Sequence, residues 1–248
     1  MSEWNAALYD KKHDFVAEYG KGLLEFVPKN KKLSILDLGC GTGTLTAQLA
    51  EFAETIIGID SSESMIEKAR TQYGNINFMV CDALSLPFEK QFDVVFSNAV
   101  FHWINDHNAL LNEVHKVLKP DGLLICEFGA SGNIATIDNA FKKACRDSGY
   151  EFKAKFNFPT SEHFAGLLNA NGFIIDKIYD FDRPTPLKDN EIGLVNWINQ
   201  FYASELELIP ENTRNEIIEK VECLTRSLLW NGKEWIADYR RLRAVAHI

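Results

Sequence analysis

The sequence contains no run of consecutive apolar residues approaching the roughly 20 that a helix needs to cross a bilayer. Its first stretch, MSEWNAALYDKKHDF, also lacks the basic-then-apolar pattern of a secretory signal. We therefore expect a cytoplasmic protein that is not embedded in a membrane.

Cysteine and histidine are scarce, with five and six residues, and none of their spacings matches a zinc-binding motif. His102 and His107 are five positions apart, which does not place both rings on one helix face. The cysteines are odd in number, widely spaced and mostly within apolar runs, which is typical of reduced thiols that pack as small hydrophobic residues. They are Cys40, Cys81, Cys126, Cys145 and Cys223. No metal site is expected.

Basic residues are outnumbered, since 26 Lys and Arg stand against 35 Asp and Glu, and the formal net charge is -9. A charge of this sign repels nucleic acid and anionic membrane surfaces. The expected partner is therefore a small molecule, and the sequence leaves the oligomeric state open.

The first two-thirds of the chain alternate short apolar segments with longer amphipathic ones. Five short segments carry apolar residues on both faces, which is typical of parallel strands covered by helices. These strands are predicted over 33–38, 55–59, 76–80, 92–97 and 123–128. Helices are predicted over 44–52, 63–72, 107–118 and 133–147, and Pro120-Asp121-Gly122 is predicted to turn the chain into the fifth strand. The alternation predicts an α/β fold with a doubly wound sheet.

The pattern changes after Cys145. We predict a strand over 173–181, a loop over 183–190, helices from 191 to about 230, and a closing strand within 234–248. The helical block is too long to be a simple connection, so it is predicted to form a cap. The predicted division is a main domain of 1–183 and 231–248 with a helical cap over 184–230.

A glycine-rich loop follows the first predicted strand. Gly39, Gly41 and Gly43 allow a ligand to approach the backbone closely, because a Cβ there would obstruct it. The spacing is G-x-G-x-G, which differs from the dinucleotide fingerprint G-x-G-x-x-G, and no Gly-Lys-Ser/Thr of a phosphate-binding P-loop follows. Asp37, just before the loop, is predicted either to contact a cofactor or to fix the loop by accepting backbone N–H groups.

Two carboxylates end the next two predicted strands. Asp60 lies about twenty residues beyond the loop, where a carboxylate can accept both hydroxyls of a ribose. Asp82 ends the third strand and suits an adenine amino group. Together they favour a cationic ligand such as a sulfonium over a pyrophosphate.

Five stretches resemble, in order, the successive motifs of class I S-adenosylmethionine-dependent methyltransferases. They are LDLGCGTGTLT, GIDSSESMIEKAR, CDALSLPF, FDVVFSNAVFHWI and VLKPDGLLI, between residues 33 and 128. The resemblance implies S-adenosylmethionine as cofactor and a mostly parallel seven-stranded, Rossmann-like sheet whose last strand is antiparallel. It further implies cofactor contacts from Gly39 and Gly41 along the methionine moiety, Asp60 at the ribose, Ser61 and Met65 flanking the adenine, Asp82 and Ala83 at its edge, and Asn98 beside the methionine.

A narrower similarity is to the trans-aconitate methyltransferase group, whose members convert free carboxylates to esters. It is carried by WNAALY, SNAVFHWINDH and VNWINQFYA. It implies that Trp4 and Tyr9 form part of an N-terminal lid over the cofactor. The chain departs from the group at His102-Trp103, where the group has Gln-Trp, and no arginine pair can be assigned to substrate carboxylates.

The acceptor side is predicted from three residues. His102 is a candidate general base or a shape-determining residue, Trp103 a pocket wall, and Trp197 a cap residue facing substrate. A carboxylate acceptor, with a pKa of about 4, is ionised at neutral pH and needs no base. The main prediction is therefore O-methylation of a small acid.

The sequence alone leaves other functions open. A hydroxyl or carbon acceptor, as in quinone-biosynthesis methyltransferases, would need a base, and His102 is the candidate. A nicotinamide-dependent oxidoreductase and a non-catalytic cofactor-binding protein are the alternatives from other classes.

Overall fold

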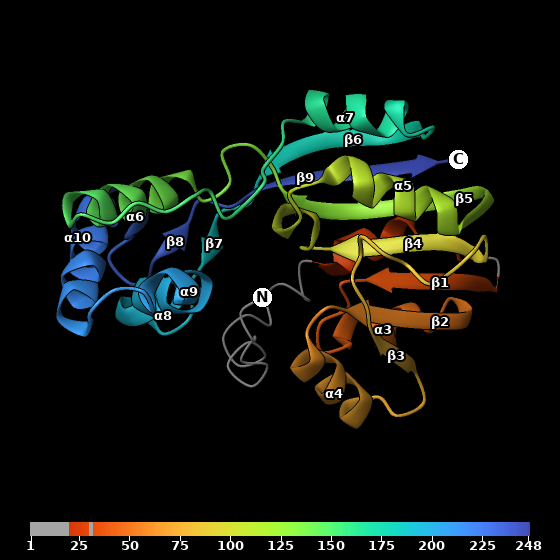
Figure 1. Ribbon diagram of the computed structural model, residues 1–248, viewed down its shortest axis with the longest axis horizontal. Coiled ribbons are helices and arrows are strands. Elements are labelled where there is room, and N and C mark those ends of the chain that lie inside the picture. Colours follow the sequence, from red (N-terminus) through yellow and green to blue (C-terminus); the bar gives the residue numbers. More distant parts are fainter. Residues whose placement is uncertain (1–19, 30–31) are drawn as a thin grey trace. The chain divides into compact units, whose positions relative to one another are not determined.

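A seven-stranded sheet in the order β3-β2-β1-β4-β5-β9-β6 is the central feature of the computed structural model, which describes residues 20–29 and 32–248 (Figure 1). Its strands are β1 (Leu33–Leu38), β2 (Ala53–Asp60), β3 (Asn77–Val80), β4 (Phe92–Asn98), β5 (Leu118–Gly129), β6 (Ile174–Asp182) and β9 (Arg240–His247). A separate two-stranded sheet contains β7 (Thr185–Pro186) and β8 (Ile236–Ala237).

The sheet is mostly parallel. The pairs β1–β2, β2–β3, β1–β4 and β4–β5 all run in the same direction. β9 runs against β5, because the end of β9 meets the start of β5: the Asp121 N–H donates to the Ile248 carbonyl, and the Ile248 N–H donates to the Gly122 carbonyl. Its arrow opposes that of β4 in Figure 1. The prediction of a doubly wound, mostly parallel sheet with an antiparallel last strand is confirmed.

The chain winds outward from β1 to β3 and then returns to place β4 on the other side of β1. Ligands of open α/β sheets bind outside the carboxyl ends of the strands at such a reversal. The order of the strands therefore places the candidate site beyond the carboxyl ends of β1 and β4.

The helices are α3 (Thr44–Leu49), α4 (Glu63–Gln72), α5 (His107–Val117), α6 (Ala135–Asp147), α7 (Ser161–Ala170), α8 (Gly193–Phe201), α9 (Ala203–Leu206) and α10 (Glu211–Leu229). Short 3-10 helices are η1 (Lys21–Phe26), η2 (Phe101–Trp103) and η3 (Asn190–Ile192). α7 was not predicted from the sequence. Two features of the sequence indicate this helix: the Thr160 side chain, which accepts the His163 N–H as an N-cap, and the apolar residues Phe164 and Leu168 at helical spacing.

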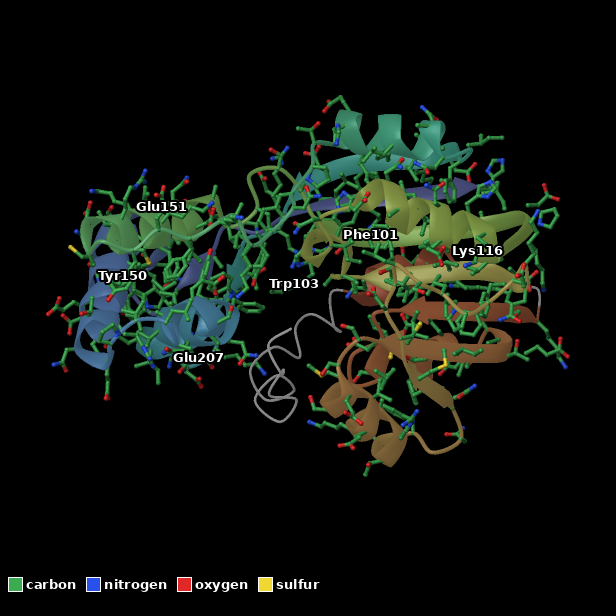
Figure 2. The ribbon with its side chains drawn as sticks, in the orientation of Figure 1. Phe101, Trp103, Lys116, Tyr150, Glu151 and Glu207 are labelled. Atoms are coloured by element: carbon green, nitrogen blue, oxygen red, sulfur yellow. The ribbon has the colours of Figure 1, made fainter. Side chains whose placement is uncertain are left out.

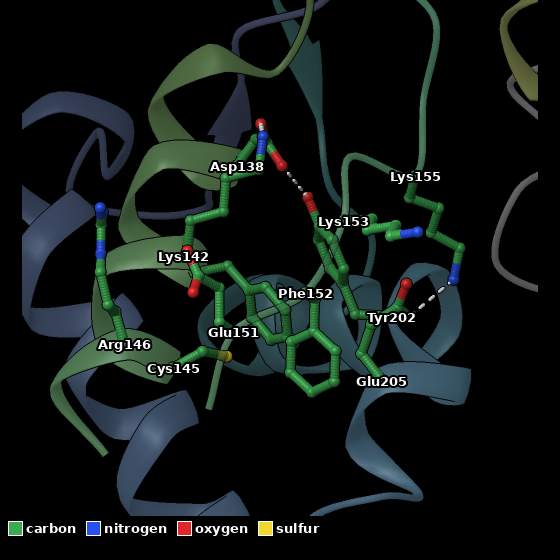
Figure 3. Close-up of a pocket in the computed structure, with 11 residues that line it drawn as sticks. Asp138, Lys142, Cys145, Arg146, Glu151, Phe152, Lys153, Lys155, Tyr202 and Glu205 are labelled. Atoms are coloured by element: carbon green, nitrogen blue, oxygen red, sulfur yellow. Dashed lines mark hydrogen bonds and ion pairs between the residues drawn. The ribbon is translucent and has the colours of Figure 1, made fainter. Parts of the chain in front are cut away.

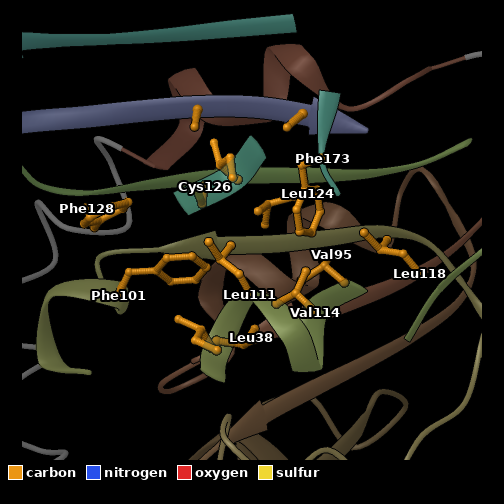
Figure 4. Close-up of a cluster of buried hydrophobic side chains, with 14 of the residues drawn as sticks. Leu38, Val95, Phe101, Leu111, Val114, Leu118, Leu124, Cys126, Phe128 and Phe173 are labelled. Atoms are coloured by element: carbon orange, nitrogen blue, oxygen red, sulfur yellow. The ribbon is translucent and has the colours of Figure 1, made fainter. Parts of the chain in front are cut away.

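Both faces of the sheet are covered, and the side chains of alternate residues in each strand point to opposite faces. Leu36, Val95 and Leu124 belong to one cluster with α5 and α7 (Figure 4). Their neighbours Ile35 and Val94 pack on the other face with η1 and α3. A strand buried on both faces needs apolar residues at nearly every position, which explains the continuous apolar runs of the sequence.

The structure differs from the sequence prediction at the start of β5. That strand begins at Leu118, so Pro120-Asp121-Gly122 lies within it and does not precede it. Phe92 pairs with Leu118 but Val94 with Leu123, so the three residues form a bulge in the ladder. Asp121 adopts a positive φ of 63° there, which turns the strand locally without ending it.

The predicted closing strand is also divided. β8 pairs with β7, inside the segment predicted as a loop, and β9 joins the main sheet. Between them, the Asp238 carboxylate accepts the Thr136 N–H (2.8 Å), and the Asp238 carbonyl accepts the Ile134 N–H (2.9 Å). The N–H groups at the start of α6 have no acceptor within the helix, so the break between β8 and β9 provides them with hydrogen-bond acceptors.

Two compact units can be distinguished by their internal contacts. The first contains residues 1–130, 156–180 and 242–248, and the second contains 131–155 and 181–241. Within the second unit, α6 and α8 pack against α10. The second unit thus includes α6 in addition to the helices of the predicted cap, and the division at 184–230 stays a prediction.

Candidate functional site

The glycine loop after β1 is tied to the end of β2. The N–H groups of Gly39 and Cys40 both donate to the Ile59 carbonyl, at 2.8 and 2.9 Å. Gly39, Gly41 and Gly43 have φ values of 78°, 54° and 84°. Glycine adopts this left-handed region without the steric cost that a Cβ imposes.

The space around the three glycines separates their roles. A Cβ on Gly39 would lie 2.1 Å from Cγ2 of Val100, and one on Gly43 would lie 2.7 Å from the Phe78 ring. A Cβ on Gly41 would meet no heavy atom of residues 20–29 and 32–248 within 4 Å. Protein packing therefore requires glycine at 39 and 43, whereas position 41 faces open space in this described part of the chain, and its contact with a cofactor stays a prediction.

Asp60 connects the loop with the end of β2. Its carboxylate accepts the Gly41 N–H at 3.0 Å and the Ser62 N–H at 2.9 Å. Burial raises the pKa of Asp60, and backbone N–H groups of Ser62, Gly41 and Ser61 lower it. A half-buried carboxylate with remaining acceptor capacity beside an open loop suits donors such as ribose hydroxyls.

Asp37 lies beneath the loop and is almost fully buried. The Thr46 hydroxyl donates to its carboxylate at 2.6 Å. The pKa of Asp37 is raised to about 7, mainly by burial. The hydrogen bond from Thr46 lowers this pKa, and the charge of Asp60 raises it. The contact with Thr46 ties β1 to α3, and a cofactor contact for Asp37 stays a prediction.

Replacing Asp37 with asparagine is expected to stabilise the ligand-free protein at high pH. The folded pKa of about 7 lies above the ordinary aspartate value of 3.8, so between these values the folded protein holds a proton that the unfolded chain has lost. The stability that Asp37 contributes at low pH is therefore lost as the pH rises through 7. Asparagine can still accept from Thr46, but its NH2 group needs a partner. We expect a gain on the order of 2 kcal/mol in the free energy of unfolding at pH 8 and little gain at pH 5. Urea denaturation at both pH values measures this, and an equal loss at both would contradict it.

The predicted adenine-side residues surround the ends of β2 and β3. The Cys81 N–H donates to the Asp60 carbonyl at 2.9 Å, which places Asp82 next to the end of β2. Asp82 accepts the Leu84 N–H at 2.9 Å, across Ala83. Met65 is buried in the first turn of α4, where its N–H donates to the Ser62 hydroxyl. The structure thus brings Asp60, Ser61, Met65 and Asp82 to one end of the sheet, and their cofactor contacts stay predictions.

The chain turns sharply after β4. Asn98 ends the strand, and Ala99 adopts a φ of 62° while its N–H donates to the Glu127 carbonyl at 2.7 Å. A non-glycine residue with this φ is uncommon, and the turn directs the chain into η2. Figure 2 shows Trp103 beyond the carboxyl end of β4.

His102 and Trp103 belong to an aromatic cluster with Phe156 and Phe158. The His102 ring centroid lies 5.4 Å from that of Trp103, 6.2 Å from Phe156 and 5.7 Å from Phe158. The Phe156 and Phe158 rings stack at 5.2 Å, and Phe156 meets Trp103 edge-on at 4.9 Å. The sequence analysis missed both phenylalanines, because the stretch from 148 to 160 has neither helical nor strand periodicity to mark them.

Trp197 is buried within the second unit. Its indole N–H donates to the Tyr239 hydroxyl at 2.7 Å, and its ring lies against Phe201 and Tyr202. These contacts give Trp197 a packing role in the helical unit. A contact with substrate stays a prediction.

The second unit also contains a pocket that the sequence did not indicate (Figure 3). Some of its charged groups pair with one another: Asp138 accepts from Tyr202 at 2.8 Å and from Lys142 at 2.5 Å, and Lys155 pairs with Glu205 at 2.8 Å. The lining as a whole has four basic residues, Lys142, Arg146, Lys153 and Lys155, against three acidic ones, Asp138, Glu151 and Glu205, so it carries a slight excess of positive charge.

Among residues 20–29 and 32–248, no group of three or more His, Cys, Asp or Glu side chains is arranged to hold a metal ion. No helix in this described part of the chain is both long and apolar enough to span a membrane. Trp4 and Tyr9 lie outside the described residues, so the predicted lid stays a prediction.

Comparison with known proteins identifies the family. Residues 36–126 match the model of a methyltransferase domain. An uncharacterized methyltransferase of Schizosaccharomyces pombe is 30% identical over 261 residues, covering 98% of this chain and 97% of that protein. A trans-aconitate 2-methyltransferase of Deinococcus radiodurans is 35% identical over 214 residues, covering 78% of each.

Solved structures share the fold. A geranyl diphosphate C-methyltransferase of Streptomyces coelicolor, in complex with S-adenosylhomocysteine, has a TM-score of 0.58 at 14% identity, covering 95% of this chain and 80% of that one. The sheet order and the open glycine loop define a doubly wound domain, a fold that binds its ligands at the topological reversal of the sheet. The chain belongs to the class I S-adenosylmethionine-dependent methyltransferases and is similar to their trans-aconitate methyltransferase group.

The prediction of S-adenosylmethionine as cofactor is thereby confirmed, and the chain is an enzyme of the transferase class. The residues present fit this cofactor, because the loop is open at Gly41 and the half-buried Asp60 carboxylate lies beside it. The nicotinamide-dependent alternative is set aside.

Proposed function

We propose that this methyltransferase transfers the methyl group to a carboxylate oxygen of a small acid. The observation that carries the proposal is the aromatic cluster beyond β4, in which His102 is the one ionisable member beside Trp103, Phe156 and Phe158. An acid with a pKa of about 4 is already an anionic nucleophile at neutral pH, so it needs no base from such surroundings. The relationship to trans-aconitate 2-methyltransferase supports the same acceptor class.

The residues of the chain supply binding, orientation and exclusion of water. Gly41 and Asp60 would hold the cofactor, which when bound supplies an electrophilic methyl group on a sulfonium. Catalysis then depends on holding the acceptor oxygen in line, at roughly 3 Å from the methyl carbon, and keeping water away. The half-buried rings of Trp103, Phe156 and Phe158 provide an apolar surface for the body of the acid.

The test is transfer of a labelled methyl group from S-adenosylmethionine into a small-metabolite extract, followed by mild base treatment of the product. We expect the label to be released as methanol, because base hydrolyses a methyl ester. Asp60→Ala, assayed in parallel, is the control for transfer that depends on the site. If the label is incorporated but is not released by base, the product is not an ester. That result would contradict the carboxylate acceptor and would favour a hydroxyl or carbon acceptor.

A further inference from the structure

We infer that Asp37 and Asp60 use the positive charge of the cofactor as their counter-ion, so that the site distinguishes S-adenosylmethionine from its product S-adenosylhomocysteine by charge. The two compounds differ by one methyl group and by the positive charge that this group gives to the sulfur. The inference goes beyond the proposed function, because it concerns the cofactor and is independent of the acceptor.

Asp37 and Asp60 lie on the same face of the sheet. Asp37 of β1 is paired with Gly58 of β2, and Asp60 ends β2 two residues later. Alternate side chains of a strand point to one face, and the strands are ~4.8 Å apart with a rise of ~3.3 Å per residue. The Cα atoms of the two acids are therefore roughly 8 Å apart, near the carboxyl ends of their strands.

Neither carboxylate has a cationic partner in the described part of the chain. Asp37 accepts the Thr46 hydroxyl at 2.6 Å. Asp60 accepts the N–H groups of Gly41 and Ser62, at 3.0 and 2.9 Å. All three donors are neutral, so they satisfy hydrogen bonds without neutralising the charge of the two acids.

The elements around Asp37 place no cation against it among the described side chains. β4 places Phe96 opposite Asp37, and α3 contains no ionisable side chain. Glu25 of η1 is an exposed acid. α4 packs against Cys40 of the loop, and its Arg70 guanidinium donates to the carbonyl of a β3 residue at 2.8 Å. The charge that bears on Asp37 is that of the second acid of the pair, which has the same sign.

The negative charge of the pair reaches the glycine loop. Cys40 lies between Gly39 and Gly41, and the pKa of its thiol is raised by burial and then by the charges of Asp37 and Asp60. A cation held at this loop is attracted by both carboxylates, whereas a neutral ligand is not. The methionine moiety, which carries the sulfonium, is predicted to lie along this loop. Its positive charge is the counter-ion that the two acids lack within the described residues.

The protonation of Asp37 is coupled to this charge. Burial raises the pKa of Asp37 to about 7, so in the protein alone most of these carboxyls hold a proton at pH 6.5. A cation near a carboxyl lowers its pKa. Binding of S-adenosylmethionine should therefore release a proton from Asp37, and binding of S-adenosylhomocysteine should not.

The same coupling favours release of the product. When the methyl group is transferred, the electron pair of the broken S–CH3 bond stays on sulfur, which becomes neutral. Asp37 and Asp60 then lose their counter-ion, and Asp37 takes up a proton from the solvent. Charge thus favours the exchange of S-adenosylhomocysteine for S-adenosylmethionine.

Titration calorimetry without an acceptor measures the released protons, because the apparent binding enthalpy depends on the ionisation enthalpy of the buffer. At pH 6.5 we expect release of about 0.5 proton or more per S-adenosylmethionine, and of less than about 0.2 per S-adenosylhomocysteine. From pH 5.5 to 7.2, the ratio of the Kd of S-adenosylhomocysteine to that of S-adenosylmethionine should rise about 10-fold, as follows if the cation lowers the pKa of Asp37 to about 5.5. This range stays below the pKa of about 8 of the α-amino group that both ligands carry.

Two variants assign the proton. Asp37→Asn keeps the shape of the side chain but cannot ionise, so the proton release and the pH dependence of the Kd ratio should both disappear. A purely structural role of Asp37 would instead weaken both ligands by the same factor. Thr46→Val removes the hydrogen bond that lowers the pKa of Asp37, so the rise of the Kd ratio should move to higher pH.

Proton release that persists in Asp37→Asn would overturn the inference, and so would equal Kd values for the two compounds throughout the pH range. These titrations contain no acceptor. Their outcome is therefore separate from that of the base treatment, which tests the proposed carboxylate acceptor.

Discussion

Replacing Gly41 with alanine is expected to remove cofactor binding while leaving the protein folded. The added Cβ would meet no atom within 4 Å in the described part of the chain, and the φ of 54° at this position lies in the left-handed region that alanine tolerates at a cost of about 1 kcal/mol. The cofactor is expected to approach the protein backbone through the open space in front of Gly41. The alanine methyl group would fill this space and is expected to displace the cofactor. We expect the Kd of S-adenosylhomocysteine to rise by at least about 100-fold, measured by titration calorimetry.

Two other glycines provide the controls. Gly149→Ala adds a Cβ at a φ of 83° with no neighbour within 4 Å among residues 20–29 and 32–248, so it repeats the backbone cost in the second unit. It should lower the stability slightly and leave S-adenosylhomocysteine affinity unchanged. Gly39→Ala would place Cβ 2.1 Å from Val100 and should destabilise the fold itself. If Gly41→Ala binds S-adenosylhomocysteine as wild type does, the ligand does not approach the loop at this position.

The sequence predicted the sheet well because its strands are buried on both faces. β1 matches its predicted range of 33–38, and α4 matches 63–72, where the Ser62 side chain caps the helix by accepting the Met65 N–H. Such elements are encoded locally, by continuous apolar runs and by capping side chains. The bulge at Pro120-Asp121-Gly122 was missed because it depends on pairing with β4 and on the end of β9, which are distant in sequence.

The candidate site was likewise only partly predictable from the sequence. Gly39, Gly41 and Asp60 lie in the βα turn and at the end of the next strand, so the sequence motifs were enough to predict their place at the carboxyl ends of the strands, and their cofactor contacts stay predictions. The surroundings of His102 could not be predicted, because the Gly129 N–H and the rings of Phe156 and Phe158 reach it through tertiary packing. A local pattern shows which residue lies at a strand end, but it does not show which ring nitrogen is occupied.

Asp60→Ala is expected to have the largest effect on the cofactor. The carboxylate serves the loop by accepting the Gly41 and Ser62 N–H groups, and we assign its remaining acceptor capacity to the ribose hydroxyls. Hydrogen bonds to a charged group contribute about 1.5–3 kcal/mol each, so the loss of two corresponds to roughly a 1000-fold rise in the Kd of S-adenosylhomocysteine. Asp82→Ala is the matched control, since it also removes a carboxylate at a strand end, and we expect a rise of no more than about 10-fold.

A 2′-deoxy analogue of S-adenosylhomocysteine separates the two roles of Asp60. If Asp60 holds the ribose, wild type should bind the analogue more weakly than the parent, while Asp60→Ala should bind both equally weakly. If Asp60 acts solely by ordering the loop, the preference for the parent compound should persist in Asp60→Ala, because its ribose contact would be elsewhere. The second outcome would refute the ribose assignment while preserving the role of Asp60 in holding Gly41, since the hydrogen bond at 3.0 Å requires no ligand.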